Sequence, residues 1–426
     1  MTYTIARCVL FATTLALANG CGVGVQPLMP TPAVFSEVGA LPLVDVPPER
    51  RWTPRRVFYA TTRQRTNDKQ RVDYGNRVAD QVSMGMAIVG FGDYGTTWAD
   101  LDVASRENPR EQELDLEFSG VVETSRVRLS DIGDGTNEAD ETGWLRRAFN
   151  ESIEETKSGS VLIFVHGAKV NFYNACVFAA QLDHFMGRDT TPVAFSWPTR
   201  QNIVSYGLGG DVQRAYEAAP ALAMLIEMIA ERSPATRIDI VCWSAGARVT
   251  SRALDVLAER TPGEARKDLR IGTVYFAAGD VPRKEFIPLL PDIHDLADRV
   301  VVSVSSNDSA LRGASAFMGG GLRIGQTGGT VDEKDSAMLA SLERLEIVNV
   351  SLGSDERGFD ITGHRYWFDH PWASSDLVVA VSAGLAAADR GLVASDHPSI
   401  WALPADYPAQ LRDDMVRLGR VRPPGE

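Results

Sequence analysis

The second half of the chain alternates short apolar runs with longer segments of helical spacing, and this alternation constrains the fold more than any other feature. The apolar runs predict buried strands at 161–165, 192–197, 238–242, 269–278, 299–305 and 345–350. The segments between and after them predict helices at 172–186, 212–231, from 245 onward, and at 377–387. Strands that alternate with helices form a mostly parallel sheet with helices on both faces. We therefore predict an α/β fold whose functional residues lie where the strands end.

The region before this alternation predicts additional β-structure. Alternating patterns typical of strands occur at 56–63, 83–89 and 120–129. We expect these strands to extend the main sheet or to cover one of its edges, and 144–155 predicts a packing helix. We place the main domain at 54–395, including this N-terminal strand extension. The proline-containing residues 396–426 predict an irregular C-terminal tail.

The N-terminus predicts export. An apolar segment from Cys8 to Leu17 is too short to span a bilayer as a stable helix, so residues 1–20 are predicted as a signal peptide. The small residues before Cys21 resemble the end of a bacterial lipoprotein signal, which would make Cys21 a lipidated anchor in the outer membrane of the cell envelope. An ordinary cleaved signal, giving a periplasmic or secreted protein, is the alternative. The prolines of residues 21–53 predict a tether, or a strap over the surface.

Ser244 lies at a corner between a predicted strand and a predicted helix. Two small residues, Ala245 and Gly246, follow it where strand and helix pass closest. Such a corner is the geometry of a nucleophile elbow, which lifts a serine hydroxyl out of the sheet. Cys242 replaces the usual first glycine of G-x-S-x-G, so the motif is only half present. The rest of the chain must therefore decide whether this serine is a nucleophile.

Residues of suitable chemistry follow other predicted strands, in the order Ser, acid, His that is typical of an α/β-hydrolase triad. Ser244 would be the nucleophile and His364 the base that removes its proton. Asp308 would fix the tautomer of the base and stabilise its charge. Asp280 also ends a predicted strand and is the alternative acid. The sequence favours Asp308, because most α/β-hydrolases place the acid one strand later than Asp280.

The chain has six histidines, so each can be considered as the base. His364 follows a glycine after the last predicted strand. His370 precedes a proline and is expected to pack or to cap, and His397 is a more distant alternative. His184 and His294 are predicted to lie on the surface.

Seven stretches of the chain form a recognisable set between about residue 57 and about residue 377. They are FYATTR, VLIFVHGAKVNFYNA, PVAFSWPTRQNIVSYGLGGD, IDIVCWSAGARV, VYFAAGDV, SVSSNDSAL and GHRYW. With them the chain resembles the mainly bacterial α/β-hydrolases of unknown function that are described as esterase/lipase superfamily enzymes. The FSWP stretch followed by Tyr206 and Asp211 is distinctive. The resemblance implies an α/β-hydrolase fold and serine hydrolase activity, with natural substrates not settled and no cofactor.

The resemblance also implies supporting residues. His166, which precedes Gly167, would support the loop of the oxyanion hole and would not be the base. The backbone N–H groups of Ala168 and Ala245 are the expected oxyanion donors, one of them at a helix N-terminus. Two departures fall in this region: Ala168-Lys169 stands where an aromatic-asparagine pair is usual, and Cys-Trp-Ser-Ala-Gly replaces His-Ser-Met-Gly at the elbow. They affect the expected substrate preference more than the expected fold.

Composition narrows the choice of partners. The formal net charge of −13 argues against a nucleic-acid partner, which needs a basic face. The sequence has no metal-binding or phosphate-loop motif, so no metal and no cofactor are expected. Cys176 and Cys242 are expected to be buried thiols, with a disulfide as the alternative. The glycine-rich residues 313–334 predict either a mobile flap over the site or a disordered insertion.

Together these features predict a serine hydrolase that acts on a small-molecule or lipid carboxylic ester through an acyl-enzyme on Ser244. One alternative is an envelope lipoprotein that uses the same fold as a non-catalytic binding or structural module. Another is an acyltransferase or amidase with the same triad, because the acyl-enzyme is common to all three reactions.

Overall fold

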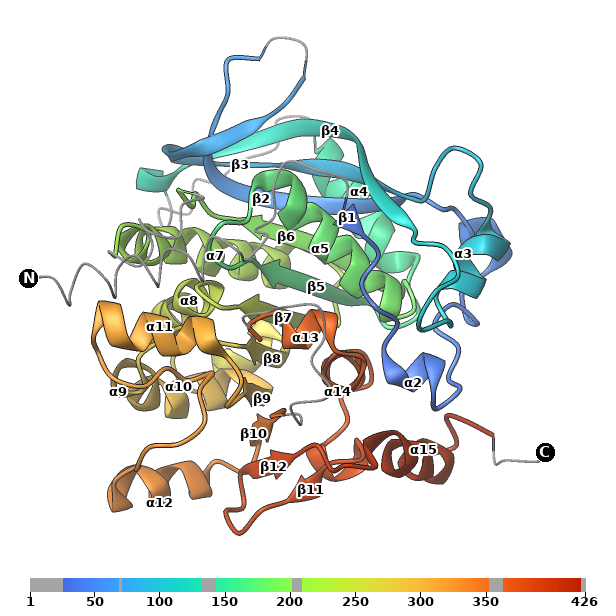
Figure 1. The fold of residues 1–426 in the computed structure, drawn as a ribbon. Helices are drawn as coiled ribbons and strands as arrows, with labels where there is room; N and C mark the ends of the chain where they lie inside the picture. Colours follow the sequence, from blue (N-terminus) through green and yellow to red (C-terminus); the bar gives the residue numbers. More distant parts are fainter. Residues whose placement is uncertain (1–25, 69–70, 132–142, 201–208, 352–362, 423–426) are drawn as a thin grey trace, which may run out of the picture.

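A twelve-stranded sheet forms the centre of the molecule, in the order β1-β4-β3-β2-β6-β5-β7-β8-β9-β10-β12-β11 (Figure 1). The computed structural model describes residues 26–68, 71–131, 143–200, 209–351 and 363–422. The strands are β1 Gln26–Pro27, β2 Arg55–Arg65, β3 Tyr74–Phe91, β4 Asp115–Arg128, β5 Ser160–Val165, β6 Thr190–Ser196, β7 Arg237–Trp243, β8 Ile271–Ala277, β9 Ala297–Val304, β10 Leu345–Asn349, β11 Val393–Ala394 and β12 Ile400–Ala402. The α-helices are α2 Ala33–Ser36, α3 Trp98–Ala104, α4 Trp144–Glu154, α5 Phe172–Phe185, α7 Val212–Arg232, α8 Gly246–Arg260, α9 Arg283–Phe286, α10 Leu290–Leu296, α11 Ser309–Met318, α12 Glu333–Ser341, α13 Tyr366–Asp369, α14 Pro371–Ser382 and α15 Tyr407–Arg417.

The central part of the sheet is parallel, as predicted from the alternation of strands and helices. Every neighbouring pair from β2 and β6 through β10 and β12 is parallel. The N-terminal strands extend this sheet, because β3 pairs antiparallel with both β2 and β4. The predicted α/β fold, with a mostly parallel sheet and extra N-terminal strands, is therefore confirmed. The last predicted helix, 377–387, is instead α14, which begins at Pro371 because a proline is well suited to the first turn of a helix.

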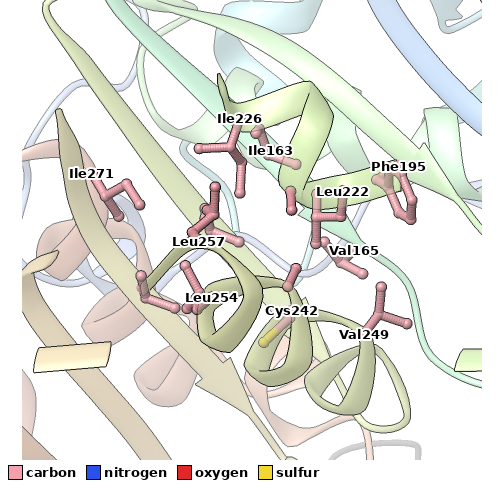
Figure 2. Packing of buried hydrophobic residues seen from close by; sticks show 14 of the residues in the cluster. Ile163, Val165, Phe195, Leu222, Ile226, Cys242, Val249, Leu254, Leu257 and Ile271 are labelled. Atoms are coloured by element: carbon pink, nitrogen blue, oxygen red, sulfur yellow. The ribbon is translucent and has the colours of Figure 1, made fainter. Parts of the chain in front are cut away.

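The parallel strands from β2 to β10 send alternate side chains into two apolar cores. In β5, Val161, Ile163 and Val165 enter the core that α7 and α8 cover. Leu162 and Phe164 enter the core on the other face, which α5 and α14 cover. Figure 2 shows the first core, where side chains of α7 and α8 meet those of β5, β6 and β7. Each fully buried leucine or isoleucine there contributes roughly 1.5–3 kcal/mol.

The N-terminal segment is packed against the body wherever the structure describes it. Its apolar side chains at Leu28, Met29 and Val34 belong to the core beneath α5 and α14. The Met29 amide donates to Gln181 Oε1 at 2.6 Å, and the Val34 amide donates to Ser375 Oγ at 2.8 Å. From residue 26 onward the predicted 21–53 tether is therefore not free, because more than half of its large apolar side chains are buried in this core. The predicted signal peptide and Cys21 lie outside the described residues.

The predicted irregular C-terminal tail at 396–426 is wrong over much of its length. It contains β12, which pairs parallel with β10, and the eleven-residue helix α15. Three buried residues of α15, at spacings of four, place one face of the helix on the body: Tyr407, Leu411 and Met415. Pro408 suggested a break in the sequence, but it lies in the first turn, where a helix needs no backbone donor.

Candidate active site

Ser244 occupies a strained corner between β7 and α8. Its φ angle is 53°, in the left-handed region that a residue with a Cβ atom rarely adopts. Three backbone hydrogen bonds of 3.0 Å hold it there: the Ser244 amide donates to the Ala277 carbonyl, and the Ser244 carbonyl accepts from the Ala247 and Asp280 amides. Strain of this kind, about 1–3 kcal/mol, persists only where the surroundings enforce it, and it is typical of a nucleophile elbow.

Glycines allow the chain to pass close to this corner. A Cβ atom at Gly246 would lie 2.4 Å from the Val165 carbonyl oxygen, because α8 starts directly against the end of β5. A Cβ atom at Gly167 would lie 3.0 Å from Ser244 Cβ. Cys242, which replaces the usual first glycine, is accommodated because it is buried in the core. The elbow is therefore complete in geometry although its sequence motif is not.

The structure brings Ser244, His364 and Asp308 together. His364 Nε2 lies 2.8 Å from Ser244 Oγ, and His364 Nδ1 lies 2.7 Å from Asp308 Oδ2. A carboxylate can only accept, so Nδ1 carries the proton and Nε2 is left to accept from the serine hydroxyl. Asp308 is fully buried and Ser244 is 6% exposed. The arrangement can therefore deprotonate the serine and stabilise the imidazolium that results.

Asp308 is held in place by the helix that follows it. It is the N-cap of α11, and its Oδ1 accepts from the Leu311 amide at 2.9 Å. One carboxylate oxygen therefore caps the helix while the other faces His364. This double use fixes the direction of the carboxylate.

Asp280, the alternative acid, is not placed against a histidine. Its carboxylate lies 2.9 Å from Arg323 Nε and 3.7 Å from Arg248 Nη2, and all three side chains are buried. Its backbone amide, as noted above, holds the Ser244 carbonyl. Through this amide, Asp280 helps to hold the backbone of the elbow in place.

The other histidines lie elsewhere. His370 caps α14, as predicted, with its Nδ1 accepting from the Trp372 amide at 3.2 Å, and burial lowers its pKa to about 4. His397 accepts from the Ser399 amide in a loop before β12. The surface prediction for His184 is wrong: it is fully buried on α5, 2.7 Å from Ser105 Oγ, because the N-terminal strands and strap cover this helix. His294 is half-buried and contacts Arg344.

The loop after β5 carries the predicted oxyanion donor. His166 is fully buried, and its ring is stacked on Trp197 with an interplanar angle of 8°. Burial first, and then the charge of Arg63, lower the pKa of His166 well below its usual value, so it is neutral. In the described part of the chain, the amides of Ala168 and Ala245 donate to no protein acceptor. His166 and Gly167 lie in this loop, with His166 Nδ1 2.8 Å from the Gly167 carbonyl oxygen, and the supporting role that the resemblance implies for them stays a prediction.

Two contacts near His364 were not recognised from the sequence. Trp243 Nε1 donates to the His364 carbonyl at 3.3 Å, and the two rings pack at a centroid distance of 5.7 Å. The Tyr366 hydroxyl accepts from the Ala278 amide and contacts Ser303, each within 3.1 Å. Trp243 is one of the residues in which the elbow departs from the usual motif, and Tyr366 is part of the GHRYW stretch. Both residues therefore stood in recognised motifs, but the sequence assigned no role to either.

The glycine-rich segment after Asp308 is neither a free flap nor a disordered insertion at its centre. The Ile324 amide donates to the Val281 carbonyl, and the Gly325 amide donates to the Gly279 carbonyl. Arg323 is 1% exposed, and a Cβ atom at Gly325 would lie 2.7 Å from the Gly279 nitrogen. Residues 323–325 therefore pack on residues 279–281, which follow β8 and contact the elbow through the Asp280 amide.

Other expectations can be compared with the described residues only. Cys176 and Cys242 are free and buried, as predicted. No group of three or more described His, Cys, Asp or Glu residues is arranged to hold a metal ion. Within the same ranges, no helix is both long and apolar enough to cross a lipid bilayer. Tyr206 lies outside the described residues.

The parallel sheet, the strained elbow and the Ser244, His364 and Asp308 contacts define an α/β-hydrolase. Residues 141–377 match the model of a family described as alpha/beta hydrolase of unknown function (DUF900). The match covers more than half of the chain, and the protein belongs to this family. A search of curated proteins gave no match.

Proposed function

We propose that the protein is a carboxylic ester hydrolase that acts through an acyl-enzyme on Ser244. The observation that carries this proposal is the continuous contact from Ser244 Oγ through His364 to the buried Asp308 carboxylate. Membership of an α/β-hydrolase family supports hydrolase chemistry in general.

The proposed reaction has two halves. Ser244 Oγ attacks the ester carbonyl carbon while His364 Nε2 takes the hydroxyl proton, and the tetrahedral oxyanion is bound by the Ala168 and Ala245 amides. His364 then gives this proton to the leaving alcohol as the C–O bond breaks, which leaves the acyl group on Ser244. Water attacks the acyl-enzyme with His364 again as base, and the acid is released as the serine regains its proton.

A fluorophosphonate probe tests this function directly, because it phosphonylates only a serine that its neighbours have activated. We expect the purified full-length protein to be labelled, with the adduct on the peptide that contains Ser244, and to hydrolyse short p-nitrophenyl esters. Prior denaturation should abolish labelling. A natively folded protein that is not labelled would favour the non-catalytic module instead. Transfer of the acyl group from Ser244 to an added alcohol or amine, in preference to water, would indicate an acyltransferase.

We further propose that the chain is an exported lipoprotein anchored through Cys21 to the outer membrane. Support comes from the apolar segment at 8–17 and the small residues before Cys21. Because the N-terminal segment is docked from residue 26, only residues 22–25 separate the anchor from the body. Four extended residues span at most roughly 15 Å, so the enzyme would stay close to the membrane surface.

Replacing Cys21 with serine is expected to move the protein from the membrane fraction to the soluble fraction, because acyl chains supply the attachment. Esterase activity should be retained, since the site is far along the chain. Cys8→Ser is the matched control, because Cys8 lies in the predicted signal and should leave with it. Fractionation and intact mass measure the outcome. An N-terminus other than a diacylated or triacylated Cys21 would contradict the anchor and leave a periplasmic or secreted enzyme.

A further inference from the structure

Arg63, near the end of β2, is a buried cation that the proposed reaction does not yet use. Its side chain is fully buried. Within the described ranges, no carboxylate lies within ion-pair distance of its guanidinium. Burial of a charge without an ion partner is costly, so such a group is retained only where many hydrogen bonds compensate. Burial lowers the pKa of Arg63 to about 9, which leaves it charged at neutral pH.

The hydrogen bonds of Arg63 reach the loop that carries the oxyanion donor. Its Nη2 donates to the Val170 carbonyl at 2.6 Å, and its Nε donates to Ser196 Oγ at 2.8 Å. Its Nη1 donates to the Gly75 carbonyl at 3.1 Å. One guanidinium thus joins the loop after β5 to three strands of the sheet, and Thr199 Oγ1 adds a second donor to the Val170 carbonyl.

Arg63 also faces the imidazole of His166, at 3.4 Å from Nε2. The Trp197 amide donates to the same Nε2 at 3.1 Å. The third neighbour of Nε2, Ser196 Oγ at 3.4 Å, already accepts from Arg63 Nε and can donate its own proton. Since Arg63 and the Trp197 amide are donors, Nε2 is unprotonated, and the single ring proton of the neutral His166 is on Nδ1. That Nδ1–H has one acceptor, the Gly167 carbonyl at 2.8 Å. Arg63, next to Nε2, therefore favours the tautomer of His166 in which Nδ1 carries the proton, and this Nδ1–H donates to the Gly167 carbonyl.

The Gly167 carbonyl belongs to the same peptide group as the Ala168 amide. A trans peptide is planar, so the direction of its C=O fixes the direction of its N–H. A hydrogen bond accepted by the C=O also polarises the N–H and makes it a stronger donor. We propose that Arg63 is a positioning residue for the oxyanion hole: it holds the Val170 carbonyl directly, and through His166 it orients the Gly167–Ala168 peptide toward the reacting serine. This inference rests on the proposed esterase function.

The test compares two buried arginines of the same strand. Arg55, at the start of β2, is 9% exposed and binds Asp183, the Thr190 carbonyl and the Arg188 carbonyl, far along the strand from Arg63. Lysine keeps the charge of either residue but cannot reproduce the planar fork of donors. Both Arg63→Lys and Arg55→Lys are expected to lower the melting temperature, so stability alone does not separate them.

Kinetics on a short p-nitrophenyl ester separates them. We expect Arg63→Lys to lower kcat about tenfold to hundredfold with KM nearly unchanged, because an oxyanion donor acts on the transition state and its loss costs about 10²–10³-fold. A trifluoromethyl ketone, which forms an oxyanion on the serine, should bind the variant more weakly by the same factor. Arg55→Lys should leave kcat and ketone binding unchanged in the folded protein.

A double-variant cycle tests the route through His166. If Arg63 acts through this ring, Arg63→Lys combined with His166→Gln should lose little more activity than the worse of the two single variants. A folded Arg63→Lys enzyme with wild-type kcat, or one whose loss falls only on KM, would overturn the proposal. Fully additive losses would overturn the His166 route. A wild-type protein that neither hydrolyses esters nor reacts with fluorophosphonate would instead remove the esterase function, and this inference with it.

Discussion

Replacement of Ser244 with alanine is expected to reduce the hydrolysis of a short p-nitrophenyl ester by ~10³-fold or more, and to abolish fluorophosphonate labelling. The loss is large because Ser244 Oγ, 2.8 Å from His364 Nε2, would form the covalent bond to the acyl group. In other serine hydrolases, an enzyme that lacks one triad residue keeps only the catalysis that substrate binding and the oxyanion hole supply.

The alanine variant should fold normally. Serine and alanine both carry a Cβ atom, so the strain at φ 53° is nearly the same in both, and the three backbone hydrogen bonds of residue 244 remain. Ser374→Ala is a suitable control, because Ser374 is buried on α14 and its hydroxyl donates to the Pro371 carbonyl. Initial rates, labelling and thermal unfolding should be measured on all three proteins. Unchanged turnover in a folded Ser244→Ala protein would exclude Ser244 as the nucleophile.

The sequence was most informative where apolar runs and strand ends coincide. The buried strands from 161 to 350 were predicted from their apolar runs, because helices cover both faces of these strands and most of their positions are therefore apolar. The contact between Ser244, Asp308 and His364 was expected from their place after β7, β9 and β10, since the carboxyl ends of parallel strands share one edge of the sheet.

The sequence was less informative where burial depends on distant segments. His184 reads as a surface residue of a helix until α3 and the N-terminal strap cover it. The pattern around Arg63 indicates only a charged residue near a strand end, and two of its hydrogen-bond partners, Val170 and Ser196, lie more than a hundred residues away. Local pattern carries no information on such pairs, because the side-chain partner is chosen by the tertiary fold.

The predictions of a tether at 26–53 and of an irregular tail over the C-terminal helix α15 were wrong for a second reason. Prolines dominated the interpretation of both segments, yet a proline excludes only certain backbone positions. The spacing of Tyr407, Leu411 and Met415 was a helical signal that Pro408 obscured. At the elbow the sequence motif was incomplete, although the backbone has the full geometry of a nucleophile elbow. A glycine is not required at position 242, because the Cys242 side chain is buried in the core.

The two candidate acids are expected to respond in opposite ways to the same substitution. Asp308→Asn should lower kcat by ~10³-fold or more, because an amide nitrogen that donates to His364 Nδ1 would stabilise the tautomer whose Nε2 cannot accept the serine proton. Stability should change little, since asparagine is as good an N-cap as aspartate and can still accept from the Leu311 amide. Asp308→Asn is thus a substitution that alters the chemistry and spares the fold.

Asp280→Asn should destabilise the protein and spare the chemistry. It removes the carboxylate that lies beside the buried Arg323 and Arg248 side chains, and removal of one partner of a buried ion pair costs about 3–5 kcal/mol. The Asp280 backbone amide still holds the Ser244 carbonyl, so kcat per folded molecule should stay within a few-fold of wild type. Rates at neutral pH, together with denaturant unfolding of both variants, measure the two effects separately. If Asp280→Asn abolishes turnover while Asp308→Asn unfolds the protein and preserves turnover in the folded fraction, the roles of the two aspartates must be exchanged.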